Sequence, residues 1–332
     1  MAGELSLTLT YQGLLTSTLF GYLDSNRFWD NVADATPTLD WYMSGERMRL
    51  QRGGERLTVA IMNELNDTAK SYSNYETLDT TATEGFTRAT FDWKQYSVTI
   101  VISGNELTSN MGEAALFDLL QAKTTQAETS ISNKLSTDLF TDGTGNSSKN
   151  LTGLDAMVDT TPTASTYAGI NRANATWWRN QAVTSVGAAA TNLLPNLRTQ
   201  YNNCTQGKGG MGSKPDWITT TQTVHESFEA LMFPFLQYQG AATQDNSVNA
   251  GLSNLRYKNA SVTWDADETS GYMHILNGQH TWLVVHPDRR LAMAEGGFQK
   301  PVNQDALITQ VLFKGNLVTN ADKKLGVLSG IT

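Results

Sequence analysis

The stretch NMGEAALFDLLQAKTTQAETSISNKLSTDLFTDG, residues 110–143, predicts one long helix with a defined start and a defined stop. Asn110 can cap the first turn, and Glu113 lies three residues on, at the spacing of a capping box. The stop is predicted at Asp142-Gly143, because glycine can take the left-handed conformation that closes a helix. Roughly 28 helical residues at 1.5 Å per residue would make a spine about 40 Å long.

Apolar residues recur along this helix at sums of three and four, which predicts a single buried face. They are Leu116, Leu120, Ala127, Ile131, Leu135 and Leu139. Polar residues such as Lys123 and Gln126 lie between them. A two-helix hairpin broken near residues 123–125 is the alternative, but neither Gly nor Pro interrupts the stripe there.

Composition limits the classes of protein that this chain can belong to. Its 332 residues, 39% of them hydrophobic, suffice for two domains or for one core with extensions. No apolar run approaches the ~20 residues that span a bilayer, so no membrane segment is expected. Cys204 is the single cysteine, which excludes an internal disulfide and favours a small buried hydrophobe. The net charge of −8 and the lack of a Lys/Arg cluster in the sequence predict only loose contact with nucleic acid.

Residues 1 to about 50 are rich in aromatic rings but show no sustained period, so they predict an arm lying on the body or on another subunit. A short helix around residues 20–32 fits within it. The rings belong to Tyr11, Phe20, Tyr22, Phe28, Trp29, Trp41 and Tyr42.

Two stretches with strand alternation follow, residues 57–61 and 96–102, and they predict an antiparallel hairpin. Phe91 and Trp93 alternate in the opposite parity, which predicts a bulge near residues 94–95. About 20 polar residues, 66–85, form the tip. Two strands alone bury too little apolar surface in water, so either a third strand of the same chain or a neighbouring subunit must cover this hairpin.

From about residue 188 the pattern predicts a second, mixed α/β domain. Helices are expected around residues 193–201 and 224–232, and strands at 217–220, 262–264, 272–276 and 282–286. The Gln/Asn/Ser-rich residues 237–253 read as a surface insertion. Residues 306–313 are apolar on both parities, as in a strand covered on both faces.

Catalytic motifs are lacking. The four histidines, His225, His274, His280 and His286, do not have zinc-protease spacing, and neither a nucleophile elbow nor a dinucleotide fingerprint occurs. The glycine-rich stretches FTDGTGNSSKN and TQGKGGMGSKPD fail the tests for a cation loop and a phosphate loop. No catalytic residue, cofactor site or metal site is therefore predicted.

The order of these parts resembles the major capsid protein of tailed double-stranded DNA bacteriophages, which has the Hong Kong ninety-seven type shell fold. The resemblance covers nearly the whole chain. Its most specific stretches are ATFDWKQYSVTIVISGNELTSNMGEAA, LFTDGTGNSSKNLTGLDAMV, TYAGINRANATWWRN, PDWITTTQTVHESFEAL and KPVNQDALITQVLFKGNLV. It implies an α+β fold in five parts. These are an N-arm (1–50), an extended E-loop hairpin (51–102), a peripheral domain with the spine helix (103–187), an axial domain (188–295) and a C-terminal return to the peripheral domain (296–332).

The resemblance also implies the function: a structural subunit, not an enzyme, that assembles as hexamers and pentamers into an icosahedral head around packaged double-stranded DNA. Implied partners are further copies of itself, a portal protein and a possible decoration protein. Because some members carry a scaffolding segment ahead of the shell domain and this chain starts near the arm, a separate scaffolding protein is expected. The implied location is the virion, and the host cytoplasm during assembly. The alternatives are an encapsulin-like compartment shell and, less favoured, a two-domain α/β enzyme.

The hairpin supplies the candidate subunit contacts. Tyr72, Tyr75 and Phe86 lie near its tip, and Phe91 and Trp93 lie further down the second strand. Aromatic rings contribute large areas at interfaces, so these five are predicted as contact anchors. Some family members crosslink an E-loop lysine, but no motif around Lys70 identifies it as reactive, and a solvated lysine is expected.

Overall fold

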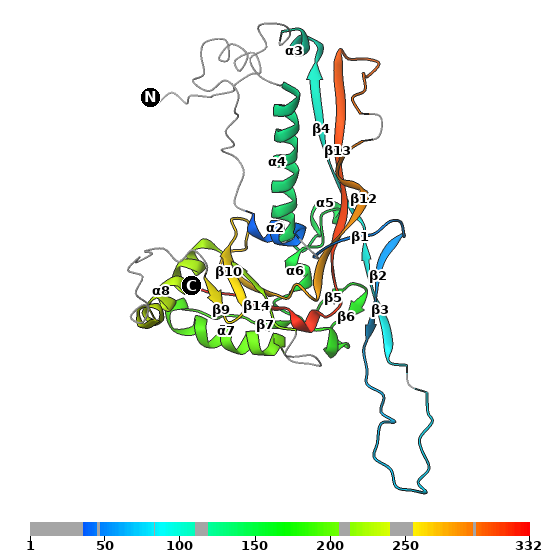
Figure 1. Cartoon of the computed structure of the whole chain (residues 1–332), viewed down its shortest axis with the longest axis vertical. Coiled ribbons are helices and arrows are strands. Elements are labelled where there is room, and N and C mark those ends of the chain that lie inside the picture. Colours follow the sequence, from blue (N-terminus) through cyan, green and yellow to red (C-terminus); the bar gives the residue numbers. More distant parts are fainter. Residues whose placement is uncertain are drawn as a thin grey trace. The chain divides into compact units, whose positions relative to one another are not determined.

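The computed structural model describes residues 36–44, 47–82, 84–109, 119–205, 213–239, 255–294 and 297–332 (Figure 1). The chain divides into two compact units, each of which is described by itself. Among the described ranges, the first unit draws on Ser97–Ser132 and Leu291–Leu312, and the second on Asp34–Tyr96, Asn133–Arg290 and Phe313–Thr332.

A six-stranded sheet forms the centre of the second unit. Its strand order is β7 (Gln181–Val183), β14 (Gly326–Leu328), β11 (Met273–Leu276), β8 (Trp217–Thr220), β10 (Ala260–Trp264) and β9 (Arg256–Tyr257). β8 pairs antiparallel with β11 and parallel with β10. All four residues of β11 are buried, because this strand lies in the interior of the sheet and is covered on both faces.

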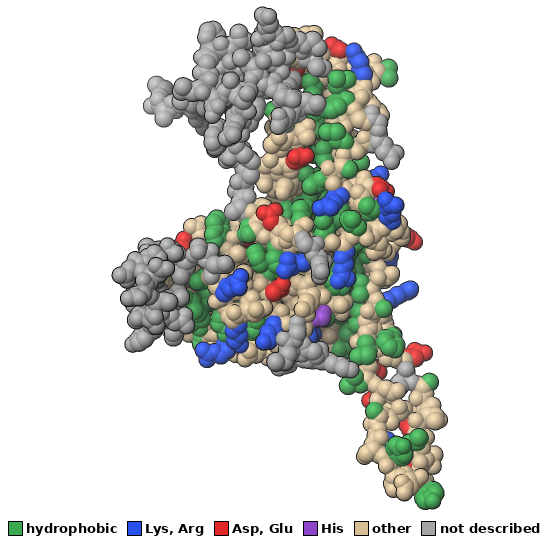
Figure 2. Space-filling view, in the orientation of Figure 1, with side chains coloured by type: hydrophobic (Ala, Val, Ile, Leu, Met, Phe, Trp, Pro, Cys, Tyr) green, Lys and Arg blue, Asp and Glu red, His purple; other side chains and the backbone are tan. Residues whose placement is uncertain are grey.

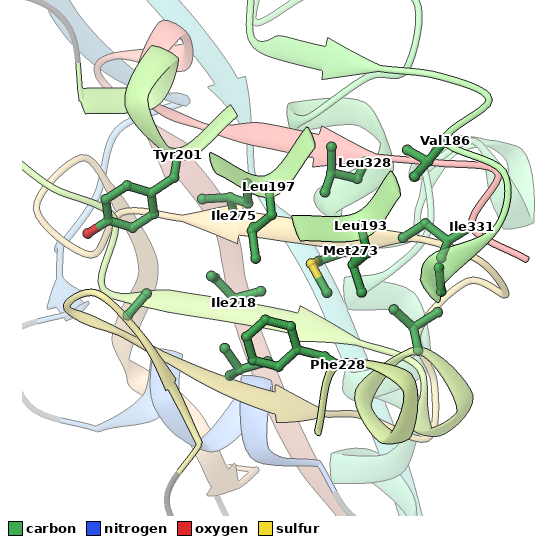
Figure 3. Packing of buried hydrophobic residues seen from close by; sticks show 14 of the residues in the cluster. Val186, Leu193, Leu197, Tyr201, Ile218, Phe228, Met273, Ile275, Leu328 and Ile331 are labelled. Carbon is green, nitrogen blue, oxygen red and sulfur yellow. The ribbon is translucent and has the colours of Figure 1, made fainter. Parts of the chain in front are cut away.

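Two helices, α7 (Ala189–Thr205) and α8 (Gln222–Gln239), lie on one face of this sheet. Figure 3 shows Leu193 and Leu197 of α7 and Phe228 of α8 directed toward Ile218 and Met273 of the strands. The core is therefore built from apolar positions of both helices at helical spacing. Cys204 lies buried in it, as the sequence predicted, and burial raises the pKa of its thiol to about 12.

The elements expected from residue 188 onward are confirmed, with one difference at the boundaries. β7 and β14 belong to the same sheet but lie outside residues 188–295, the range expected for the axial domain. The sheet thus takes strands from before and after that range. The five-part division as a whole stays a prediction. Of the insertion expected at 237–253, residues 237–239 belong to α8, and residues 240–253 lie outside the described residues.

The segment that precedes the hairpin rests on the same unit. α2 (Pro37–Met43) buries Trp41 and Tyr42, with 6% and 0% exposure. Trp41 stacks on Trp217 at 5.4 Å between ring centroids, and the Thr38 hydroxyl donates to the Thr219 hydroxyl at 3.0 Å. These two rings of the predicted arm therefore lie on the body, while the other five fall outside the described residues.

A four-stranded sheet has the order β1 (Met48–Leu50), β12 (Thr281–Met293), β13 (Ala306–Thr319) and β4 (Lys94–Ser103). β1 runs parallel to β12, with Met48 opposite Leu283. β13 begins where the sequence predicted a strand and continues six residues further. In the first unit, Ile100 and Ile102 of β4 and Val311 of β13 form a small core with Ala127.

The spine helix is present as α4 (Leu119–Leu139), 21 residues long, and α3 (Gly104–Ser109) precedes it. Ile131, Leu135 and Leu139 are 3%, 1% and 1% exposed, which confirms the predicted phase. Asn110, Glu113 and Leu116 and the side chain of Leu120 lie outside the described residues. Gly143 has φ +77°, so its predicted left-handed conformation is confirmed, but the helix ends at Leu139 and Gly143 does not close it.

Short elements connect the spine helix to β7 of the six-stranded sheet. They are α5 (Gly145–Ser148), α6 (Leu154–Met157), the strands β5 (Thr166–Tyr167) and β6 (Ile170–Asn171), and the 3-10 helix Thr176–Trp178. A second 3-10 helix, Asp322–Lys324, lies between β13 and β14. Gly153 is required where it stands, because a Cβ there would lie 2.4 Å from the carbonyl oxygen of Leu139. This close approach places α6 against the end of the spine.

The predicted strand pairing of the hairpin is wrong in one respect. β2 (Arg56–Met62) pairs antiparallel with β3 (Phe86–Asp92), while β4 belongs to the other sheet. The chain leaves one sheet at Trp93 and enters the next at Lys94. The opposite parity of Phe91 and Tyr96 therefore marks a change of sheet and not a bulge within one strand.

Candidate assembly surface

The base of the β2–β3 hairpin is fixed by burial within its own chain. Leu57 is opposite Phe91 in the register, and these side chains are 1% and 3% exposed. The Phe91 ring meets Tyr167 edge to face at 5.7 Å between centroids. Beside it, the Thr90 N–H donates to the Ala168 carbonyl at 2.9 Å. The base of the hairpin is thus part of the core of its own subunit.

This burial corrects two expectations. Phe91 is not available to a neighbouring subunit, because its ring is already enclosed by its own chain. The apolar face that was expected to need cover is buried here too, since Ile61 and Ala89 are 7% and 0% exposed. Either the same chain or a neighbouring subunit was expected to cover this apolar face. At the base of the hairpin the same chain covers it. The β5–β6 hairpin does so, and not a third strand added to the ribbon.

A buried ionic cluster holds the β5–β6 hairpin. The Arg172 guanidinium donates to Asp322 Oδ2 at 2.6 Å and to the Met157 carbonyl at 2.6 Å, and it lies 4.7 Å from the centroid of the Tyr167 ring. The side chains of Arg172 and Asp322 are both 0% exposed. Burial raises the pKa of Asp322 to about 7, and Arg172 opposes that shift. Breaking such a pair leaves an uncompensated charge in the interior, so the cluster fixes Tyr167, on which Phe91 rests.

The stretch GINRANATWWRN, residues 169–180, therefore has an anchoring role. Trp178 is 1% exposed and stacks on Tyr167 at 6.4 Å, and its indole N–H donates to the Tyr167 carbonyl at 3.3 Å. Sequence reasoning gave Arg172 no role. The available signal was weak, because this segment holds two arginines, Arg172 and Arg179, among asparagines and tryptophans, and nothing in the spacing marks Arg172 as the buried one.

The tip of the hairpin, residues 63–85, is held by its own polar groups. Asn66 Oδ1 accepts from the Thr68 N–H at 3.0 Å, and Asp79 Oδ1 accepts from the Thr81 N–H at 3.0 Å. Lys70 pairs with Glu76 at 3.4 Å, with both side chains more than two-fifths exposed. These local turn contacts define the backbone conformation of the tip but bury little apolar surface.

Apolar side chains on this tip and on the strand ends beside it are exposed. Tyr72, Tyr75 and Phe86, three of the predicted anchors, are 66%, 101% and 79% exposed. Phe86 is opposite Met62 in the register, so the two form an exposed cross-strand pair at the end of the ribbon. Leu65 and Leu78 are exposed as well. Figure 2 shows hydrophobic side chains on the surface of this hairpin.

Trp93 lies between these extremes. Its ring is half-buried, its indole N–H donates to the Gly54 carbonyl at 2.9 Å, and the Lys314 ammonium lies 5.0 Å from its centroid. The interface roles of Tyr72, Tyr75, Phe86 and Trp93 stay predictions.

Two of the four histidines, His280 and His274, lie in side-chain networks of the second unit. His280 lies in a chain of hydrogen bonds: the Ser213 hydroxyl donates to Nε2 at 2.5 Å, and Nδ1–H donates to Asn320 Oδ1 at 2.8 Å. Burial lowers the pKa of His280. This is the connectivity of a nucleophile, a base and an orienting group, which sequence reasoning did not find. Ser213 is only 7% exposed, however, and its hydroxyl also accepts from the Asn277 amide at 3.3 Å, so the network is closed.

His274 forms the second buried polar cluster. Its Nδ1 lies 2.9 Å from Glu268 Oε1, and its Nε2 lies 3.8 Å from Asp155 Oδ1. Burial alone would lower the pKa of His274, but these two carboxylates outweigh it and raise the pKa above its ordinary value. His225 and His286 take part in neither cluster.

Neither a metal-binding cluster nor a membrane-spanning helix is evident in the described ranges. No group of three His, Cys, Asp or Glu residues could hold a metal ion there. None of the helices in that part of the chain is long and apolar enough to cross a bilayer.

Comparison with solved structures identifies the fold of this chain. No protein-family model matches the sequence, and no curated protein matches it. Among solved structures, the capsid asymmetric unit of cyanophage A-1(L) is similar at a TM-score of 0.69 and 15% identity, over 98% of this chain and 99% of that chain. The capsid of a native GTA particle is similar at a TM-score of 0.60 and 11% identity, over 92% of this chain and 94% of that chain. The holo-SrpI encapsulin complex from Synechococcus elongatus is similar at a TM-score of 0.57 and 9% identity, over 96% of this chain and 95% of that chain.

At these identities the likeness establishes the fold. The chain has the α+β fold of phage capsid shells, the Hong Kong ninety-seven type that the resemblance predicted.

Proposed function

We propose that this chain, which has the fold of phage capsid shells, is the major capsid protein of a tailed double-stranded DNA bacteriophage. It is a structural subunit, without catalytic activity, that assembles as hexamers and pentamers into the icosahedral head. One observation carries the proposal: the likeness to the cyanophage A-1(L) capsid extends over 98% of this chain and 99% of that one. A shared fold of this extent includes the hairpin as well as the sheets.

The partners follow from this role. The chain binds further copies of itself, is guided by a separate scaffolding protein, and meets a portal protein and a possible decoration protein. It encloses packaged DNA with loose contact, in keeping with its net charge of −8. It belongs to the virion and, during assembly, to the host cytoplasm.

An encapsulin-like compartment is the second candidate, because the SrpI encapsulin shares the fold at a TM-score of 0.57. The contents of the particle distinguish the two. A phage head assembled in infected cells holds DNA, whereas a compartment of the encapsulin type holds protein cargo.

Negative-stain electron microscopy of the protein, co-expressed with the genes that neighbour its own, tests the proposal. We expect closed particles of uniform diameter, together with rings of five and six subunits. A discrete monomer under every condition of co-expression would instead support a soluble two-domain protein.

A further inference from the structure

We propose that a cavity beside the last turn of α7 binds a phosphate ester, the chemical group of nucleotides and of the DNA backbone. The cavity has a volume of about 340 Å³, and all of its walls belong to the second unit. It is lined by residues of α7, of the segment before β8 and of the β9–β10 turn, which are Tyr201, Asn202, Thr205, Lys214, Lys258 and Asn259. The inference goes beyond the proposed function, because the single subunit carries this cavity whether or not it forms a shell.

Tyr201 fixes the three walls of the cavity relative to one another. Its hydroxyl donates to the Pro215 carbonyl at 3.2 Å and accepts from the backbone N–H of Asn259. Its ring is 2% exposed and belongs to the core under α7 and α8. The walls are therefore held by buried contacts of the fold, and a ligand that binds between them has little structure to order.

Two lysines give the cavity its positive charge, and none of its six lining residues is acidic. Lys214 is exposed and pairs with none of the described residues. The Lys258 ammonium donates to Asn202 Oδ1 at 2.7 Å and lies 4.8 Å from the centroid of the Tyr201 ring. Both of these contacts of Lys258 are with neutral groups, so they orient its charge without neutralising it.

The surface around the cavity adds to this charge. Arg198 is exposed, lies four residues before Asn202 on the same face of α7, and pairs with no residue in the described ranges. Asp216, the carboxylate that follows Lys214 most closely in the sequence, is paired with Arg47 at 3.1 Å. Figure 2 shows Lys and Arg side chains over the part of the surface where Figure 1 draws α7. These charges come from segments far apart in the chain, so the sequence shows no cluster of Lys and Arg.

The end of α7 does not oppose an anion at this place. The last carbonyl groups of a helix carry a partial negative charge. The Lys324 ammonium donates to the Thr205 carbonyl at 3.5 Å, and this cation offsets the partial charge beside the cavity.

The donors of the cavity suit a phosphate ester better than a carboxylate. A phosphate carries several acceptor oxygens, so ammonium and amide groups on separate walls can each bind one of them. The planar fork of arginine, which matches a carboxylate, is absent from the lining residues. A water molecule takes about 30 Å³ in the liquid, so a cavity of 340 Å³ also has room for the sugar that carries the phosphate.

The backbone at Lys258 supports a binding role for this side chain. Lys258 has φ +52° in the two-residue turn between Tyr257 and Ala260, which pair across the β9–β10 hairpin. Gly, Asn or Asp usually occupies such a left-handed position, because other side chains are strained there. Strain of this kind persists at binding sites where the side chain itself is needed.

Binding of three probes to the full-length, unassembled subunit tests the site. The probes are inorganic phosphate, deoxyadenosine monophosphate and a short duplex DNA, and the variants are Lys258→Asn and Lys214→Gln. Each variant should bind the phosphate esters at least about tenfold more weakly, because it loses one charge-assisted hydrogen bond. For the duplex, the slope of log K against log salt concentration should become shallower by about 0.9 for each lysine removed. Binding of the mononucleotide, of the duplex or of both supports the site and identifies the source of the phosphate.

Thermal melts separate this role from a structural one. Lys258→Asn should keep or raise the melting temperature, because Asn tolerates the left-handed conformation. If Lys258 served only to pack on the Tyr201 ring, the same change would lower the melting temperature and leave binding as in the parent.

Matched controls remove the same charge at exposed positions outside the cavity: Lys149→Asn and Lys300→Gln should bind the probes like the parent. Polyglutamate, the control for charge alone, should bind more weakly than the duplex. The proposal is overturned if both lysine variants bind like the parent, if inorganic phosphate alone or no probe binds, or if polyglutamate binds as tightly as the duplex. Because every measurement uses the unassembled subunit, failure of the chain to form shells would reject the proposed function and leave this result unaffected.

Discussion

The base and the tip of the β2–β3 hairpin differ in what holds them, although one ribbon contains both. Phe91 and Phe86 stand five residues apart in β3, yet the first is 3% exposed and the second 79%. The base rests on Tyr167, which is fixed by Trp178 and by the buried Arg172. The tip is held by local hydrogen bonds and an ion pair among its own residues. One end of this ribbon is therefore part of the core of its own subunit, while the other end is exposed and is the part that we propose for assembly.

Removing the tip is the strongest way to separate these roles. Excision of residues 67–84, with the strands joined by an Asn-Gly turn, should leave a folded subunit, because the buried base is untouched. Closed particles should be lost entirely, since two of the exposed anchors, Tyr72 and Tyr75, go with the excised loop. Electron microscopy of the variant, expressed with its assembly partners, and its thermal melt give the two readouts.

Either of two results would break the comparison between base and tip. Normal shells would show that the tip is dispensable. Loss of the subunit fold would show that the tip stabilises its own subunit. A variant that only replaces Ser71 and Ser73 by Ala serves as the control, because it keeps the loop length and the exposed rings.

The two phenylalanines sharpen the comparison within one strand. Phe91→Ala should lower the free energy of unfolding by about 3–5 kcal/mol, because it leaves a cavity against Tyr167 and Leu57. Phe86→Ala should change it by less than about 0.5 kcal/mol, as at other exposed sites. Chemical denaturation of the unassembled subunit measures both. Equal losses at the two positions would mean that the ends of the ribbon are not different environments.

The sequence predicted elements better than it predicted their partners. The spine stripe, the strands after residue 188 and the left-handed Gly143 followed from local periodicity and backbone chemistry. The pairing of β2 with β3 did not, because residues 57–61 can alternate equally well against either of two later strands. Only the change in the alternation of apolar residues after Trp93 indicated that β3 and β4 are separate strands. A change of sheet and a bulge give the same pattern along the chain.

The candidate surface was found in part for a similar reason. Tyr72, Tyr75 and Phe86 were identified because they lie in a polar loop, where an aromatic ring has no local core to enter. Phe91 was misassigned because alternation gives the face of a strand but not what covers that face. The Arg172 cluster and the Ser213–His280–Asn320 network depend on segments brought together from across the chain, and no spacing in the sequence records such contacts.

Substitutions in the spine helix measure independently how much a buried side chain contributes to the free energy of unfolding of this chain. Ile131→Ala and Leu135→Ala should each cost about 2–5 kcal/mol, because both side chains are at most 3% exposed. Glu128→Ala, at an exposed position of the same helix, should cost little. Thermal melts or hydrogen exchange check the order, and the reverse order would show that the helix phase is wrong. The loss at Phe91 should fall in the range set by Ile131 and Leu135 if the base of the hairpin is core.

The smallest expected effect is a dependence of stability on pH, and it too should separate the base from the tip. The pKa of His274 is raised in the folded chain, since Glu268 and Asp155 outweigh the effect of burial, and the Tyr272 ring stacks on the imidazole. A raised folded pKa means that the folded state holds the proton more tightly than the unfolded state. The stabilisation is complete below about pH 6.5 and is lost as the pH rises through the folded pKa, and it amounts to about 1.4 kcal/mol for each tenfold difference in proton affinity between the two states.

His274→Gln should therefore flatten the change in melting temperature between acidic and mildly alkaline pH, while His225→Gln should leave it as in the parent. Because the base of the hairpin belongs to the same unit as His274, protection of the β2–β3 amides from hydrogen exchange should follow that pH dependence. Proteolysis within residues 63–85 should not follow it, since cleavage there requires no unfolding of the core. If cleavage of the tip and opening of the base showed the same pH dependence, the hairpin would be one cooperative element, and the distinction between its two ends would be lost.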